Sequence, residues 1–217
     1  MSPKNQALSG RTTVRRLPDR GFYDQETIYS ILDEGLLAHV GITTEKGPVV
    51  IPMLYGRDEE NLFLHGSPAS RLLREGSAVE LCVTISLIDA IVVARSLFHH
   101  SMNYRSVVVM GEALPVEDLD ERSRALDVIS DHVIPGRVAG TRPHHEKEIK
   151  GTLVLSMSLS EASAKIRTGP PVDDAEDHEL DTWAGVLPLG IKVGTPVPDP
   201  QLREGIATPE HILQWRR

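Results

Sequence analysis

The sequence is poor in cysteine, in aromatic residues and in long apolar runs. Its single cysteine, Cys82, excludes an intrachain disulfide and fits a reducing cytoplasmic setting. Aromatic residues make up only 4% of the chain, too few for the stacking surface of a single-stranded nucleic-acid binder. No apolar run reaches membrane-spanning length, and residues 1–20 lack the apolar centre of a signal peptide. We therefore expect a cytoplasmic protein with no membrane partner.

Positive charge is also in short supply. The chain has 23 basic and 31 acidic residues, a net charge of -8, which disfavours binding to nucleic acid. A small anionic ligand would need a local group of basic residues. The sequence contains no dinucleotide-binding fingerprint, so a nicotinamide donor is not indicated by any motif.

Short β-rich segments dominate what the sequence does contain. Most are adjacent along the chain, which favours a mainly β, antiparallel, closed or split barrel over a doubly wound sheet. Three helices are expected, over 24–35, 67–76 and 119–134. The expected strands are 36–44, 48–55, 61–65, 78–86, 90–94, 106–112, 152–159 and 162–166.

One domain with two appendages accounts for this pattern. We expect a polar arm over 1–21, the barrel over 22–169, and a proline-containing tail over 170–217 that wraps the surface of the same domain. Small barrels often pair their outer faces in dimers, where a ligand can lie in the groove between subunits.

The strongest chemical signal is the start of the expected helix 67–76. Ser67 is a good N-cap and Pro68 suits the first helical position, so free backbone N–H groups would point outward and attract an anion. Ser70 and Arg71 fall in the first turn, where a bound phosphate would offset the misplaced positive charge of Arg71. The alternative is an ordinary capped helix with a surface arginine.

A second group, Asn103, Tyr104, Arg105 and Ser106, leads into the expected strand 106–112. Two guanidinium groups, Arg71 and Arg105, together with nearby hydroxyls would satisfy a phosphate monoester. The alternatives are a surface ion pair for Arg105 and a core or interface position for Tyr104.

Metal binding is not expected. The pairs His99–His100 and His144–His145 offer no third ligand at a helical spacing, and adjacent residues on a strand face opposite ways. The acidic residues between Asp173 and Asp177 could chelate a cation, although such runs are usually solvated loops. Cys82 lies in an apolar strand without a neighbouring histidine, which indicates a buried apolar role.

Several segments, taken in order, resemble one known family. They are Val-Val-Ile-Pro-Met-Leu-Tyr-Gly, Leu-Phe-Leu-His-Gly-Ser-Pro-Ala-Ser-Arg, His-Ser-Met-Asn-Tyr-Arg-Ser-Val-Val-Val-Met-Gly, Ser-Ala-Lys-Ile-Arg-Thr-Gly-Pro-Pro and Trp-Ala-Gly-Val-Leu-Pro-Leu. This order resembles the pyridoxamine 5'-phosphate oxidase-like FMN-binding split-barrel proteins, and within them the branch with nitroimidazole-resistance reductases. The resemblance implies a homodimer of six-stranded antiparallel split β-barrels of Greek-key character, with flanking helices and FMN at the interface.

The resemblance also implies site residues. Ile51, Pro52 and Met53 match the strand that lies along the flavin ring, and His65, with its neighbour Gly66, matches the phosphate-binding hairpin. His65 is also the candidate proton donor to a substrate over the ring, the alternative being an inert hairpin-end histidine. The remaining matches are Gly66, Ser67, Ser70 and Arg71 for the phosphate, Asn103, Tyr104, Arg105 and Ser106 as supplementary charge and donors, and Lys165, Arg167 and Trp183 on the other side of the site.

Two departures argue against pyridoxamine phosphate as the substrate. Leu72 follows Arg71 where the oxidases proper carry a lysine, and acidic residues predominate in 170–217. The resemblance thus implies an FMN-dependent oxidoreductase that passes electrons from NAD(P)H to a small oxidised acceptor such as a nitroaromatic. The alternatives are a non-catalytic protein that stores or senses flavin, and a barrel that uses haem or a deazaflavin.

Overall fold

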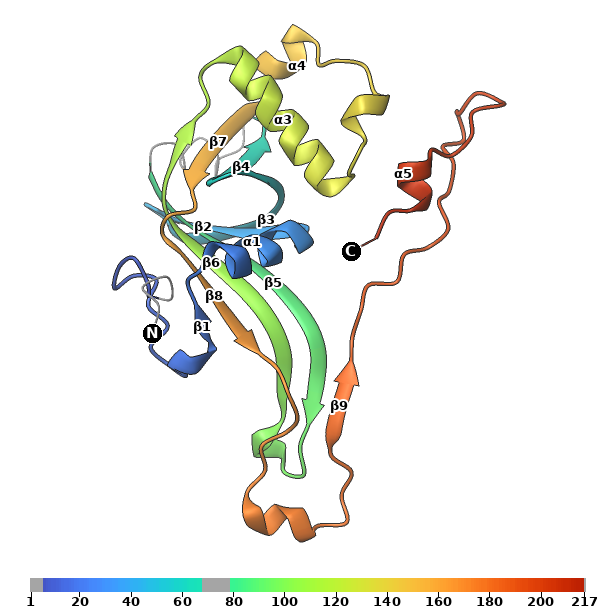
Figure 1. Ribbon diagram of the computed structural model, residues 1–217. Helices are drawn as coiled ribbons and strands as arrows, with labels where there is room; N and C mark the ends of the chain where they lie inside the picture. Colours follow the sequence, from blue (N-terminus) through green and yellow to red (C-terminus); the bar gives the residue numbers. More distant parts are fainter. Residues whose placement is uncertain (1–5, 68–78, 217) are drawn as a thin grey trace. The chain divides into compact units, whose positions relative to one another are not determined.

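The computed structural model describes residues 6–67 and 79–216, and these form nine strands (Figure 1). Contacts divide the chain into two compact units. The first unit contains Met1–Gly35, Cys82–Met110 and Ser160–Gly190. The second contains Leu36–Leu81, Gly111–Leu159 and Ile191–Arg217. Each unit is described separately below.

The first unit is built on a strand ladder in the order β1-β8-β6-β5-β9. The β1–β8, β6–β8 and β5–β9 pairs of this ladder are antiparallel, with Gly21 opposite Lys165 and Ala90 opposite Pro188. Three 3₁₀ turns flank it: η1 (Pro18–Arg20), η2 (Leu97–His99) and η4 (Ala175–Glu179). The strands are β1 (Gly21–Phe22), β5 (Val79–Val93), β6 (Ser101–Pro115), β8 (Ala162–Arg167) and β9 (Gly185–Pro188).

Helix α1 (Gln25–Glu34) confirms the expectation for residues 24–35. The Asp24 carboxylate caps it by accepting a hydrogen bond from the Thr27 N–H at 2.8 Å, and Gly35 ends it. Ile28, Ile31 and Leu32 are its buried residues, spaced to share one face. The helix contacts β8 of the same unit.

The second unit is an antiparallel ladder in the order β6-β7-β4-β3-β2, in which the end of β6 is the part that belongs to this unit. Its other strands are β2 (Leu37–Thr44), β3 (Gly47–Asp58), β4 (Asn61–Gly66) and β7 (Leu153–Ser158). Its helical segments are α3 (Leu119–Val133), η3 (Val138–Gly140), α4 (Glu146–Lys150) and α5 (Glu210–Leu213).

Helix α3 covers this second ladder, in contact with β3, β4 and β7 (Figure 1). A Cβ at Gly56 of β3 would lie 2.7 Å from the Ile129 Cα atom, so only glycine permits this close approach. The core under the helix consists of Phe63, Val116, Ala125, Leu126, Ile129 and Val154. This packing fixes β4, the strand that ends at His65 and Gly66.

The structure confirms the mainly β, antiparallel architecture and corrects several boundaries. Segments 78–86 and 90–94 form the single strand β5, because the polar Asp89 between them pairs with Arg105 of β6 and does not break the strand. Strand β6 begins at Ser101, five residues before the expected start. Within the proline-containing tail 170–217, for which no strand was expected, β9 pairs with β5. The expected helix 67–76 lies almost entirely outside the described residues.

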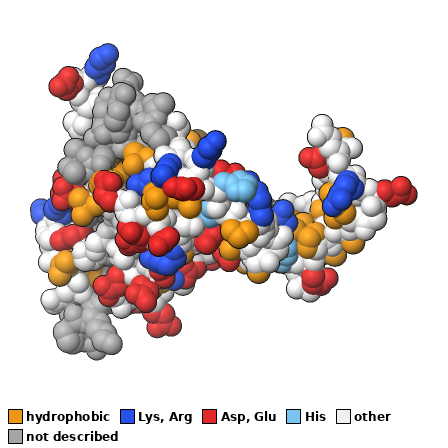
Figure 2. All heavy atoms as spheres, turned by 90° about the horizontal axis from the view of Figure 1, so that it is seen from above, with side chains coloured by type: hydrophobic (Ala, Val, Ile, Leu, Met, Phe, Trp, Pro, Cys, Tyr) orange, Lys and Arg blue, Asp and Glu red, His pale blue; other side chains and the backbone are white. Residues whose placement is uncertain are grey.

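The visible surface carries mixed chemistry. Acidic, basic and apolar side chains are interspersed on the face drawn in Figure 2. In 6–67 and 79–216, none of the helices combines the length and the apolar character needed to cross a bilayer.

Candidate functional site

The predicted phosphate hairpin falls in the second unit, where the structure describes part of it. His65 and Gly66 end strand β4, and Ser67 follows in an exposed position. Ser70 and Arg71 lie outside the described residues. Phosphate binding at this hairpin therefore stays a prediction.

His65 is the most distinctive described residue of this hairpin. It is half-buried opposite Val154 of β7, and its Nδ1 atom is buried without a hydrogen-bond partner among residues 6–67 and 79–216. Burial lowers the pKa of its imidazole, so the ring is neutral near pH 7. A neutral imidazole with an unsatisfied nitrogen can serve as a hydrogen-bond partner or as a metal ligand.

The predicted ring-binding residues lie in the middle of β3. Ile51 and Met53 are half-buried, whereas Pro52 between them is exposed. Their partners on β2 are Val40 and Ala38, both fully buried. The backbone of residues 51–53 therefore lies in a regular antiparallel ladder with β2.

Arg105, in the first unit, is held between two carboxylates. Its Nη1 and Nη2 atoms donate to Glu34, the latter at 2.8 Å, and its Nη2 and Nε atoms donate to Asp89 at 2.7 and 3.1 Å. These bonds and the two negative charges raise the pKa of Arg105 far above its usual value. A phosphate at this guanidinium would have to compete with both carboxylates.

Arg167, at the end of β8 in the same unit, is 6% exposed, and its acceptors among the described residues are all neutral. Its guanidinium donates to the Asn103 side-chain oxygen, to Gly169 O at 3.2 Å and to Pro170 O at 3.0 Å. The Asn103 amide also donates to Gly169 O, at 3.1 Å. The structure thus brings the predicted residues Asn103 and Arg167 into direct contact.

Three further predicted residues lie along the same two strands. Lys165 is paired with Ser106, and Tyr104 with Arg167, in the β6–β8 register. The Ser106 hydroxyl donates to Lys165 O at 3.3 Å. Six predicted residues therefore lie on β6 and β8 of the first unit, with Arg105 bound to its own carboxylates: Asn103, Tyr104, Arg105, Ser106, Lys165 and Arg167.

Trp183 precedes β9 and is 67% exposed. A Cβ at Gly185 would lie 2.9 Å from the Trp183 ring, so the ring packs on that glycine. The ring is anchored in its own segment and leaves an apolar face open.

The tip of the first unit gathers ionisable residues. Arg95 donates to Asp173 through its backbone N–H at 2.9 Å and its Nη1 at 2.8 Å. Beyond this ion pair, single ligand atoms of His99, Asp174 and Asp177 lie within 4.8 Å of one another. The 3.2 Å contact between His99 Nε2 and Asp174 accounts for part of that proximity.

The second histidine pair, His144 and His145, has structural contacts in the second unit. His144 Nε2 lies 3.0 Å from Asp127 Oδ1, and His145 is the N-cap residue of α4.

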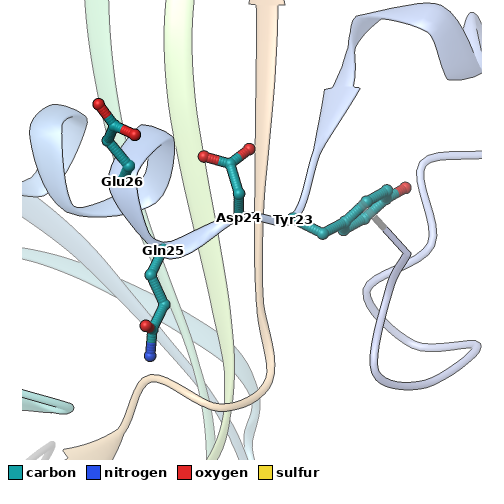
Figure 3. Close-up of a pocket in the computed structure, with 4 residues that line it drawn as sticks. All are labelled: Tyr23, Asp24, Gln25 and Glu26. Atoms are coloured by element: carbon teal, nitrogen blue, oxygen red, sulfur yellow. The ribbon is translucent and has the colours of Figure 1, made fainter. Parts of the chain in front are cut away.

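A pocket of about 430 Å³ opens at the start of α1 (Figure 3). Its described lining is Tyr23, Asp24, Gln25 and Glu26. The Tyr23 hydroxyl accepts a hydrogen bond from the Val14 N–H at 2.8 Å. Two carboxylates in this lining make the pocket unsuited to a phosphate.

The sequence interpretation missed the residues that decide the charge of the site. Glu34 and Asp89 neutralise Arg105, and Arg20 lies near enough to Arg167 to affect its pKa. Only Asp89 left a signal, since a carboxylate in the middle of an apolar β-segment needs a partner. Glu34 and Arg20 belong to segments distant along the chain and gave none.

Comparison with known proteins identifies the family. The family model for pyridoxamine 5'-phosphate oxidase matches residues 24–166, two thirds of the chain. The chain belongs to the pyridoxamine 5'-phosphate oxidase family, and the split-barrel fold expected from the sequence is confirmed. No curated protein matches the sequence.

Three solved structures are similar to this chain. The flavocytochrome Anf3 from Azotobacter vinelandii is 42% identical with a TM-score of 0.92, covering 97% of this chain and 99% of its own. An FAD and heme binding protein from Mycobacterium smegmatis is 32% identical with a TM-score of 0.86, covering 89% and 96%. A 5-nitroimidazole antibiotic resistance candidate from Bacteroides thetaiotaomicron is 25% identical with a TM-score of 0.57, covering 67% and 86%.

Proposed function

We propose that this protein is a homodimeric, cytoplasmic redox protein that binds a flavin nucleotide and haem and passes electrons from NAD(P)H to a small oxidised acceptor. The similarity to the flavocytochrome carries this proposal, because it spans nearly the full length of both chains. The second near-full-length similarity is to an FAD and heme binding protein. Haem, which the sequence analysis gave as an alternative to flavin, is therefore proposed here as a second cofactor beside it.

The described residues fit such cofactors in two respects. His65 offers a neutral imidazole whose Nδ1 accepts or donates no hydrogen bond to any described residue, which suits either a contact to the polar edge of a flavin or ligation of a haem iron. Arg167, Lys165 and the hydroxyls beside them suit an anionic group. A bound flavin would supply the hydride or electron chemistry, and the residues above would bind and orient it.

FAD is the flavin that the relatives favour over the FMN expected from the sequence, since the Mycobacterium smegmatis protein is described as binding FAD. Cofactor extraction followed by mass spectrometry distinguishes the two. A position of 51–53 along the flavin ring is compatible with either flavin, because both carry the same isoalloxazine.

Anaerobic reduction tests the catalytic part of the proposal. Full-length protein is mixed with NADPH or NADH, and its flavin absorbance is followed before and after an acceptor is added. We expect bleaching on reduction and recovery with the acceptor. A bound flavin that neither donor reduces would instead favour flavin storage or sensing.

A nitroaromatic acceptor is the second candidate function, favoured by the 25% identity to the nitroimidazole-resistance candidate over 67% of this chain. Adding a 5-nitroimidazole to the reduced protein tests it. Recovery of the oxidised flavin spectrum with dioxygen but not with the nitroimidazole would contradict this second candidate.

A further inference from the structure

Arg167 is a buried cation without a negative partner in the described part of the chain. Only 6% of the residue is exposed, and its three acceptors, Asn103, Gly169 and Pro170, are all uncharged. Removing a charge from water costs several kcal/mol unless an opposite charge compensates. Neutral acceptors satisfy N–H groups but leave the net charge unbalanced.

The surroundings of Arg167 add positive charge. Burial, followed by repulsion from Arg20, lowers the pKa of Arg167. Lys165 lies two residues earlier on β8, directly opposite Gly21, the residue that follows Arg20. Within 6–67 and 79–216, neither Arg20 nor Lys165 forms an ion pair. Three cations therefore lie on η1 and β8, and none of them forms an ion pair within the described residues, although Asp19 also belongs to η1.

Hydroxyl groups accompany these cations. In the β6–β8 register, Tyr104 lies opposite Arg167 and Ser106 lies opposite Lys165. Directly opposed residues in an antiparallel pair share a face of the sheet. Guanidinium, ammonium and hydroxyl donors together are the set that binds an anion with several oxygens.

The lack of carboxylates here is local. The chain carries a net charge of -8, and on the same strand β6 Arg105 is matched by both Glu34 and Asp89. Acidic residues are therefore available in this unit, yet among the described residues none pairs with Arg20, Lys165 or Arg167. A ligand that brings its own negative charge would complete the group.

We propose that Arg20, Lys165 and Arg167, with Tyr104 and Ser106, form a binding site for a multiply charged oxyanion. Its source is a cofactor, either the diphosphate of a flavin dinucleotide or the carboxylates of haem. The assignment of the oxyanion to a cofactor rests on the proposed function, whereas the binding of an oxyanion at this site does not. The site lies wholly in the first unit, and the predicted phosphate hairpin at Ser67 belongs to the second.

Inorganic pyrophosphate provides the direct test, by calorimetric titration of the full-length chain purified without added cofactor. We expect wild type to bind it, and Lys165→Gln and Arg20→Gln each to weaken binding about tenfold, through loss of one charge-assisted contact. Arg142→Gln is the matched control, because it removes one positive charge from an exposed Glu148 ion pair in the second unit and leaves the affinity unchanged. Arg167→Lys retains the charge and is expected to retain part of the affinity.

Absence of pyrophosphate binding by folded wild type, or equal affinities in wild type and both glutamine variants, would overturn the site. Two ligand pairs then identify the source. If Lys165→Gln weakens the binding of FAD but not of riboflavin, the oxyanion is the flavin diphosphate. If it weakens the binding of haem but not of haem dimethyl ester, the oxyanion is the pair of haem carboxylates. Pyrophosphate binding by a chain that takes up neither flavin nor haem would support the site and refute the proposed function.

Discussion

Arg105 and Arg167 lie on neighbouring strands of one unit and differ in their partners. Arg105, on β6, is held by the carboxylates of Glu34 and Asp89, whereas Arg167, on β8, is more deeply buried and has neutral acceptors alone. A cation neutralised by its own chain contributes to stability. A buried cation without such a partner is an energetic cost that a bound anion can offset. The difference separates a structural arginine from one suited to a ligand.

Arg105→Gln should give the largest loss of stability. It leaves two carboxylates close together without their shared cation, which costs about 2 kcal/mol, below the range for a fully buried pair because the three side chains are about one third exposed. Urea unfolding of the two proteins measures the difference. The exposed Arg142→Gln should stay within about 0.5 kcal/mol of wild type, and equal effects of the two substitutions would remove the structural half of the comparison.

Pyrophosphate should stabilise the wild-type chain by about 1.4 kcal/mol at roughly tenfold excess over its Kd. Arg105→Gln should retain this gain, since its guanidinium is already committed to carboxylates, whereas Lys165→Gln should lose most of it. Thermal unfolding with pyrophosphate, against sodium chloride of equal ionic strength, measures the gain. The comparison fails if Arg105→Gln abolishes it and Lys165→Gln does not.

A double-mutant cycle measures how much the ion pair between Asp89 and Arg105 contributes to stability. Asp89→Asn removes one of the two charges on Arg105, and we expect a coupling energy of about 1 kcal/mol between the two positions. The free energies of unfolding of the two single variants and the double variant give this value. Additive effects would mean that the ion pair contributes nothing measurable.

His65, in the second unit, is another half-buried titratable side chain, and its Nδ1 has no hydrogen-bond partner among the described residues. Because burial lowers its folded-state pKa, the unfolded chain binds the proton more readily. Its contribution to stability is present above the unfolded value of about 6.5 and is lost as the pH falls toward the lower folded pKa. His65→Gln should flatten the stability profile in that window by about 0.5 kcal/mol. Urea unfolding of wild type and His65→Gln between about pH 5 and pH 8 measures the difference, and parallel profiles would contradict the prediction.

Local patterns in the sequence predicted helix α1 and the strand-rich character of the chain, but not the pairing of charges between strands. The cap at Asp24 and the apolar spacing of Ile28, Ile31 and Leu32 determine α1 within the chain itself. The pairing of Arg105 with Glu34 joins residues 71 positions apart, and no periodicity encodes such a contact. The single strand β5 was missed for the same reason, since Asp89 fits a strand only once its partner on β6 is known.

For the candidate site too, the sequence predicted individual residues but not the contacts between them. Motif order predicted Asn103 and Arg167 as site residues, yet it could not show that they are in contact or that Arg167 pairs with no carboxylate of the described residues. Arg20, assigned to a polar arm, gains its relevance because β1 brings the arm to β8. Charge balance depends on which segments the fold brings together.

The absorption spectrum of the freshly purified full-length protein tests the central claim most directly. The account predicts flavin bands together with a haem Soret band, and release of both groups on denaturation. A colourless protein that takes up neither added flavin nor added haem would contradict it.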